Sequence, residues 1–339
     1  MSLSINTNTA SMVALESLNA TTSALNDTEN TVSTGQKISS SKDGPATYAI
    51  AQQMNGNISG LSAVSDGLSF AASTLSTTST AVGNIISTLA LLQTAVTSLG
   101  DNQGDPTALA QTSDEINSYL DQINTFARNA TVNGVNLLST ADDSNVANGG
   151  TAGSAGPVTA DSLIYVTSLQ GSTNTITNAT DTASGAGKVV YTVVGSDASK
   201  DQTTLTDALG LSSKMAAGDT LSAGTSVAGS NAFVTNTNGS GALTSGSSIA
   251  NLITLVQNAM TAMTDVASTL GSQAKIVDGM TSYSTNLSDS LTTGVGALTD
   301  ADMAAESAKL TSLQTKQQLA ISSLSVAKSS SQNILSLFR

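Results

Sequence analysis

Hydrophobic residues recur at helical spacing at both ends of the chain. Between residues 4 and 34 they stand mostly three or four positions apart, at Met12, Leu15, Leu18, Leu25 and Val32. Near the other end a 3-4 alternation continues through Leu310, Leu313, Gln317, Ala320, Leu324, Ala327, Ser331, Ile334 and Phe338. Each pattern marks one face of a helix. The two faces can cover each other, so the spacing predicts a coiled-coil-like pair made from both ends of the chain.

The last turn of the chain is unusually apolar. Ile334, Leu335, Leu337 and Phe338 fall within the final six residues, although chain ends are usually polar and frayed. Ala, Ser and Thr along both stripes allow close approach by further helices. These features favour terminal helices that pack against additional neighbours, and an ordinary helix pair within one chain is the alternative.

A second helical pattern follows the first. Asp43 is the predicted cap, and Pro45 stands near the first helical position, where a missing N–H costs nothing. Apolar positions continue to Leu92. The pattern predicts a helix of about fifty residues, far longer than the average in globular proteins.

The stretch "GDNQGDP" ends this helix. Asp105 as cap and Pro106 at the first position predict a third helix, which ends near Ala130. The Asn-Gly pair at 133–134, between two valines, predicts a tight hairpin.

The composition changes between residues 140 and 248, where Ser, Thr and Gly dominate. The runs "SLIYVTSL" and "KVVYTVVG" predict strands, and "LTDALGL" at 205–211 predicts a short helix. A small β-rich domain is the interpretation, with partial disorder as the alternative. Helical patterning returns from Ile249 to about Leu298, and Thr299 or Asp300 is the predicted cap of the last helix.

The predicted fold is therefore mainly α with an inserted β-rich domain. Long antiparallel helices from both termini form a rod. The predicted segments are an N-terminal helix at 1–40, a helical rod with the hairpin at 41–139, the inserted variable domain at 140–248, a returning rod helix at 249–298 and a C-terminal helix at 299–339.

Charge and composition exclude several functions. The chain has no His and no Cys, which removes the usual zinc ligands, general base and thiol nucleophile. The net charge of −13 disfavours nucleic acid and anionic membrane surfaces. No continuous apolar run approaches the roughly 20 residues of a membrane span. No signal peptide is recognisable, so we expect a cytoplasmic protein or export without a cleaved signal.

Several stretches of the sequence resemble those of a known protein family. The opening "INTNTASMVALESL", the hairpin "TVNGVNLLS" and the ending "SQNILSLFR" occur in an order that resembles bacterial flagellins. The resemblance covers residues 1–140 and 249–339. It implies a structural subunit, with no enzymatic activity and no cofactor, that polymerises with itself into the hollow extracellular filament used for swimming. It also implies secretion through the flagellar export apparatus with a chaperone, and contact with hook-associated and cap proteins.

The resemblance gives the apolar terminal residues a role in subunit packing. We assign that role to Ile5, Met12, Leu15, Leu18, Leu25, Val32, Leu310, Leu313, Leu324, Ile334, Leu335 and Phe338. A hook–filament junction protein, which shares the terminal helices, is the alternative. A surface adhesin that binds glycans through Tyr165, Tyr191 and Phe233 is a further one.

Two further features of the sequence concern charged residues. Flagellins that activate the innate flagellin-sensing receptor resemble one another in a charged stretch that falls here on Ala90, Leu92 and Gln93. Since these residues cannot form charge-assisted pairs, weak receptor activation is the prediction. Arg128 pairs with Asp121 or Glu115, or is simply solvated.

Overall fold

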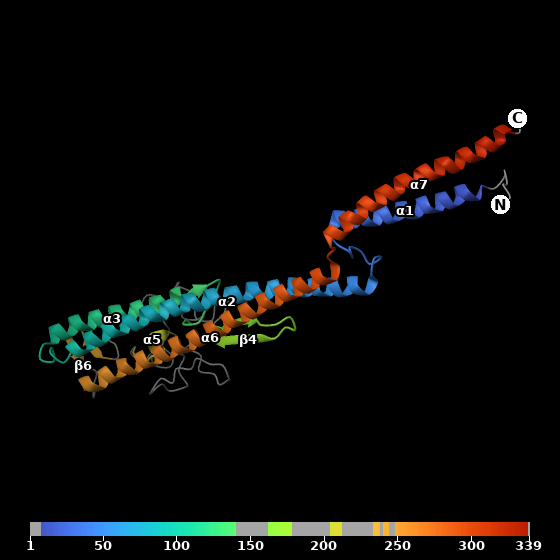
Figure 1. Cartoon of the computed structure of the whole chain (residues 1–339). Coiled ribbons are helices and arrows are strands. Elements are labelled where there is room, and N and C mark those ends of the chain that lie inside the picture. Colours follow the sequence, from blue (N-terminus) through green and yellow to red (C-terminus); the bar gives the residue numbers. More distant parts are fainter. Residues whose placement is uncertain are drawn as a thin grey trace. The chain divides into compact units, whose positions relative to one another are not determined.

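The computed structural model describes residues 8–139, 162–177, 204–211, 233–237, 240–243 and 248–337. The chain divides into two compact units (Figure 1). Unit 1 consists of Met1–Gly60 with Asn286–Arg339, and unit 2 consists of Leu61–Thr285. Helices α2 (Pro45–Ser98) and α6 (Ile249–Thr299) contribute residues to both units. The predicted long helices are confirmed, since α2 has 54 residues and α6 has 51.

Unit 2 has a continuous apolar core along three helices. Its elements are α2, α3 (Pro106–Asn129) and α6. Buried residues of α2 recur mostly at 3-4 spacing at Val64, Leu68, Ala71, Leu75, Val82, Ile85, Leu89, Leu92 and Val96. This spacing keeps one face of a long helix directed at its neighbours. Asp105 caps α3 by accepting hydrogen bonds from the N–H groups of Thr107 and Ala108, as predicted.

The predicted hairpin follows α3. Strands β1 (Thr131–Val132) and β2 (Val135–Asn136) pair antiparallel across Asn133 and Gly134. Both turn residues have positive φ, at 49° and 83°. A two-residue hairpin turn of this kind requires such a backbone, and Asn-Gly adopts it at low cost.

The inserted segment contributes short elements to unit 2. Strands β3 (Ser162–Val166) and β4 (Thr173–Thr177) form one antiparallel pair, and β5 (Val234–Thr237) and β6 (Ser240–Leu243) form another. The predicted short helix is α5 (Leu205–Ala208). The predicted strand "KVVYTVVG" lies outside the described residues.

The elements α5, β5 and β6 contact α3. A buried clamp contributes to this packing: the Asn124 amide donates to Thr206 Oγ1 at 2.9 Å, and its oxygen accepts from the Thr206 N–H at 3.1 Å. These later elements of the inserted segment are therefore docked on the third helix.

Unit 1 contains the two terminal helices, α1 (Thr9–Thr34) and α7 (Met303–Leu337), which lie side by side (Figure 1). They run antiparallel, because Asn8 lies next to Ala327 while Gly35 lies next to Ala301. The predicted pairing of the two ends of the chain is confirmed.

Two predicted caps differ from the structure. Asp43 does not cap α2; its carboxylate accepts from the N–H and hydroxyl groups of Ser39 and Ser40 and closes the preceding loop. The cap of α7 is Asp302, which accepts from the N–H groups of Ala304 and Ala305. Thr299 does not begin α7 but is the last residue of α6. Its carbonyl accepts hydrogen bonds from the N–H groups of Lys37 and Ile38.

Candidate subunit-packing surfaces

The seam inside the α1–α7 pair is made mostly of small and polar side chains. On α1 it follows Ser11, Ala14, Leu18, Thr21, Leu25, Thr28 and Val32, which are buried or half-buried. On α7 it follows Glu306, Leu310, Leu313, Gln317, Ala320, Leu324 and Ala327. The predicted α7 stripe is therefore the face that meets α1. Leu18, Leu25 and Val32 also occupy the predicted seam.

Met12 and Leu15 differ from the predicted stripe. They lie on the exposed side of α1, with 62% and 49% of their surface accessible, while Ser11 and Ala14 occupy the seam in their place. A strict 3-4 alternation from Leu18 toward the amino terminus reaches Ala14 and Ser11, because the helix turns about 100° per residue. The apolar residues of α1 thus lie on two faces, and only one of them meets α7.

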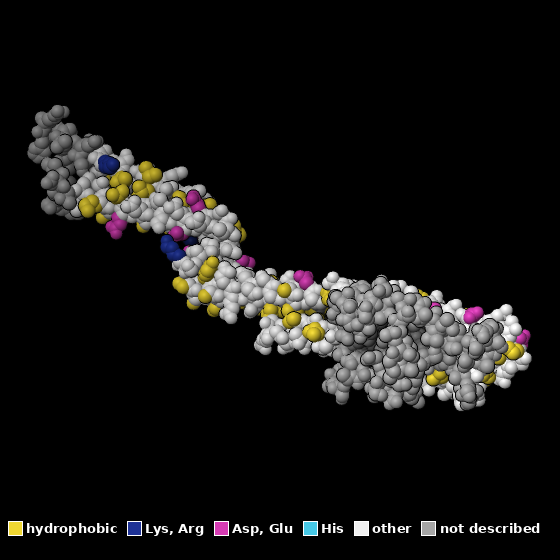
Figure 2. All heavy atoms as spheres, turned by 180° about the vertical axis from the view of Figure 1, so that it is seen from behind, with side chains coloured by type: hydrophobic (Ala, Val, Ile, Leu, Met, Phe, Trp, Pro, Cys, Tyr) yellow, Lys and Arg dark blue, Asp and Glu magenta, His cyan; other side chains and the backbone are white. Residues whose placement is uncertain are grey.

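Exposed apolar side chains also occur on α7. Leu319, Ile321 and Val326 are all more than half exposed, and Val13 adds to the exposed apolar residues of α1. Figure 2 shows apolar side chains distributed over the surface of this helix pair with few charges between them. Ile5 and Phe338 lie outside the described residues, and Ile334 and Leu335 belong to α7.

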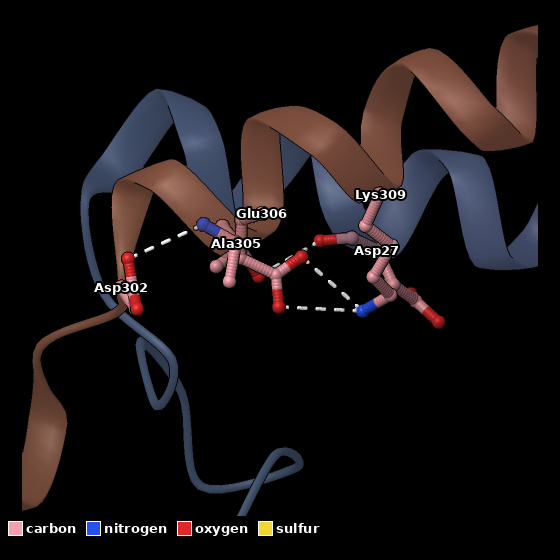
Figure 3. A network of polar contacts seen from close by, with 6 residues as sticks. Asp27, Asp302, Ala305, Glu306 and Lys309 are labelled. Carbon is pink, nitrogen blue, oxygen red and sulfur yellow. Dashed lines mark hydrogen bonds and ion pairs between the residues drawn. The ribbon is translucent and has the colours of Figure 1, made fainter.

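Ion pairing makes a small contribution here. Lys309 contacts both carboxylate oxygens of Glu306 one turn away on α7, at 3.2 and 3.3 Å, and Figure 3 shows this pair with Asp27 of α1 beside it. A partly exposed pair of this kind contributes at most about 1 kcal/mol. Contacts between apolar side chains therefore dominate the energetics of this surface.

The three positions of the receptor stretch lie in different environments on α2. Ala90 is exposed, Gln93 is half-buried and Leu92 is fully buried in the core of unit 2. Leu92 therefore offers no surface to a partner. The exposed apolar side chain at this place is Leu91, which is 52% accessible.

Charged groups on α3 interact within that helix. The Tyr119 hydroxyl donates a 2.9 Å hydrogen bond to Glu115, and this bond raises the pKa of Tyr119. Burial raises the pKa of Asp121, and the positive charge of Arg128 opposes that rise. The charge of Arg128 thus acts on Asp121, which favours Asp121 over Glu115 as its partner.

Two of the three aromatic residues considered for glycan stacking are buried and cannot take that role. Tyr165 and Phe233 are buried in the core of unit 2, so neither ring is open to a sugar, and Tyr191 lies outside the described residues. Within the described ranges no group of three or more acidic side chains is arranged to hold a metal ion.

Among the described helices, α2 alone is long and apolar enough to cross a membrane by composition. The sequence expectation considered only continuous apolar runs, whereas α2 combines Leu, Ile and Val with Ala, Ser, Thr and Gly. Its large apolar side chains lie in the core of unit 2. Core helices commonly have this character, so the composition of α2 does not identify a membrane partner.

Comparison with known proteins gives the family. The N-terminal helical region of bacterial flagellin matches residues 5–143, and the C-terminal helical region of bacterial flagellin matches residues 253–338. Flagellin FljO of Caulobacter vibrioides is 30% identical over 336 residues, which cover 99% of this chain and 98% of that protein. A flagellin of Brucella melitensis is 31% identical over 336 residues, with 99% of each chain covered. Flagellin C of Rhizobium meliloti is 30% identical over 341 residues, again with 99% of each chain covered.

Two independent family regions and near-complete relatives therefore agree with the geometry of paired terminal helices. Flagellins are structural proteins, not enzymes, and they polymerise into the extracellular filament of the flagellum. The chain belongs to the bacterial flagellins and is a structural subunit of the flagellar filament.

Proposed function

We propose that the exposed apolar side chains of the terminal helix pair form the surfaces that each subunit buries against its neighbours in the filament. The observation that carries this assignment is the exposure of Met12 and Leu15 on α1, and of Leu319, Ile321 and Val326 on α7. Water-exposed apolar side chains of this size are unfavourable in an isolated rod, and a homopolymer supplies copies of the same surface to cover them.

The free energy gained by burying these side chains is large enough to drive assembly. Full burial of a Val, Leu, Ile or Met side chain stabilises by about 1.5–3 kcal/mol. Six such side chains, counting Val13, are each about half to two-thirds exposed, so burying what remains contributes on the order of 5–10 kcal/mol per chain. The loss of translational and rotational freedom on association offsets part of this gain.

The two faces of the pair have separate roles in this proposal. Leu18, Leu25, Val32, Leu310, Leu313 and Leu324 hold the two helices together. Met12 and Leu15 extend toward other subunits, and Ile5, Ile334, Leu335 and Phe338 add apolar surface at the ends of the chain. Removing the last ten residues should therefore abolish assembly while residues 45–298 stay folded.

The proposal includes the route by which the chain reaches the filament. We propose export through the flagellar export apparatus with a secretion chaperone, without a cleaved signal peptide, and growth between hook-associated and cap proteins. The support is the flagellin family itself. A strain that lacks a functional export apparatus should retain the full-length chain inside the cell.

The test of the packing surface uses one helix. Leu319, Ile321 and Val326 are replaced together by Gln, which keeps helix propensity high and removes the apolar surface. The matched control replaces the exposed Thr311, Thr315 and Ser322 by Gln on the same helix.

Purified monomers are incubated in concentrated sulfate with filament seeds and are viewed by electron microscopy. Sulfate strengthens the burial of apolar surface. We expect long hollow tubes from the parent and the control and only monomers from the apolar triple variant. Normal tubes from that variant would refute the role given to these three side chains.

A further inference from the structure

We propose that the register of the terminal helix pair is set by polar ties at its two ends and not by the seam between them. One tie is the backbone junction of residues 35–38 with 299–301, and the other is the side chain of Asn8. This inference concerns contacts within one chain and goes beyond the proposed packing of subunits, so either can fail without the other.

The junction joins the segment that leaves α1 to the segment that enters α7. The Lys37 N–H donates to the carbonyl of Thr299 at 2.6 Å, and the Ala301 N–H donates to the carbonyl of Gly35 at 3.0 Å. Together they make an antiparallel bridge between Gln36 and Asp300. Gly35 has a φ of 71°, a backbone that glycine adopts without strain. The bridge therefore places the end of α1 at one fixed point beside the start of α7.

The second tie lies at the opposite end of the pair. The Asn8 side-chain oxygen accepts from the Ser11 N–H at 3.0 Å and caps α1. Its side-chain nitrogen donates to the backbone carbonyl of Ala327 on α7 at 3.0 Å. The residue that begins α1 thus also holds the two helices together at their far ends, 319 residues apart in sequence.

The seam between these ties discriminates poorly between registers. Ala14, Leu25, Thr28 and Leu313 are its only fully buried members, and the other described members are partly buried. The Thr28 hydroxyl is buried without a hydrogen-bond partner, which costs stability in the observed register. Small side chains at 3-4 spacing look alike after a shift of seven residues, so the seam by itself allows such a slip.

A slip of one heptad moves one helix about 10 Å along the other, a displacement that spin-label distances can resolve. The chain has no cysteine, so two introduced cysteines are the only labelled positions. We would place them at the exposed Asn30 of α1 and Gln318 of α7, which are offset by about 18 Å along the helix axis, so that a slip changes the distance between them. Filaments are grown from labelled chains diluted in excess unlabelled chain, so that the measured distance lies within one chain.

Two variants break one tie each. Lys37→Pro removes the N–H that bonds to Thr299, and Asn8→Ala removes the far tie. The control is Ser41→Pro, at the second position of the turn closed by the Asp43 N–H and the Ser40 carbonyl, a position that favours proline.

We expect one narrow distance in the parent and in Ser41→Pro. Lys37→Pro should add a second population displaced by about 10 Å along the helix axis. Asn8→Ala should broaden the distribution as the far ends separate. If only Lys37→Pro fails to assemble, the proposal is supported, because both prolines enter the same loop and only this one removes a bond to Thr299. An unchanged distribution in either variant overturns the role given to that tie.

Discussion

The Asn136 side chain joins the end of α3 to the chain that leaves the hairpin. Its amide nitrogen donates to the carbonyls of Ala127 and Arg128, at 2.8 and 3.2 Å. Its oxygen accepts from the N–H groups of Leu138 and Ser139, both at 2.8 Å. Asn136 has no accessible surface, and the two residues whose N–H groups it accepts are at most 1% exposed. Water therefore cannot replace these bonds without a local opening.

Replacing Asn136 by Ala should destabilise unit 2 strongly. The change leaves two buried N–H groups without their acceptor, and each unsatisfied group costs about 1–3 kcal/mol. The expected loss is about 2–6 kcal/mol, before any cost of the cavity. With a slope of about 1–3 kcal/mol per molar urea, the midpoint of unfolding should fall by roughly 1–2 M or more.

The assay is urea unfolding of the monomer followed by circular dichroism. Asn84→Ala, at an exposed position of α2, is the matched control and should change stability by less than about 0.5 kcal/mol. Asn136→Asp keeps the acceptor and loses the donor, so it separates the two halves of the network. A loss below about 1 kcal/mol in Asn136→Ala would contradict the reasoning, because it would mean that the N–H groups find other partners.

Further predictions concern single positions. Thr28→Val removes a buried hydroxyl without a partner and should raise filament stability by about 1 kcal/mol in thermal dissociation. Gly279→Ala, where an added methyl meets nothing within 4 Å, should stabilise α6 by about 0.5–1 kcal/mol in urea unfolding. Gly294→Ala should gain less, because that methyl would lie 2.7 Å from Met54 Cε. Hydrogen bonds from Ser40 and Ser39 lower the pKa of Asp43 below its usual value. The contribution of its carboxylate is present above the unfolded-state pKa and is lost as pH falls through the lower folded-state pKa, so Asp43→Ala should destabilise more at pH 7 than in acid, as measured by urea unfolding at the two pH values. Purified monomer should activate the flagellin-sensing receptor weakly in a reporter assay, since Ala90 offers it no charge, and a full response would contradict this.

The sequence predicts the long helices well because their signals are local and repeated. The 3-4 spacing along α2, the Asp105 cap with its proline and the Asn-Gly turn each determine structure within a few residues. The two misplaced caps show the limit of such signals. Asp43 and Asp302 stand among other cap-forming residues. Ser39 and Ser40 hold the Asp43 carboxylate in the loop, and α6 continues to Thr299, so that Asp302 is left to cap α7.

Contacts between distant residues could not be predicted in this way. Asn8 lies 319 residues from Ala327, and Asn124 lies 82 residues from Thr206. Each asparagine is ordinary in its local sequence, since Asn is common at helix ends and on helix surfaces. Only the folded chain shows that these side chains connect separate segments.

The outward placement of Met12 and Leu15 has a different cause. Hydrophobic periodicity reports that a face will be covered, and it carries no information about which chain covers it. In unit 2 the apolar face of α2 is covered by α3 and α6, so prediction and structure agree. In the terminal pair, α7 covers only the face of Leu18 and Leu25, and apolar residues remain on the other side of the helix. A helix with apolar residues on two faces needs two partners, and a filament subunit provides only one of them from its own chain.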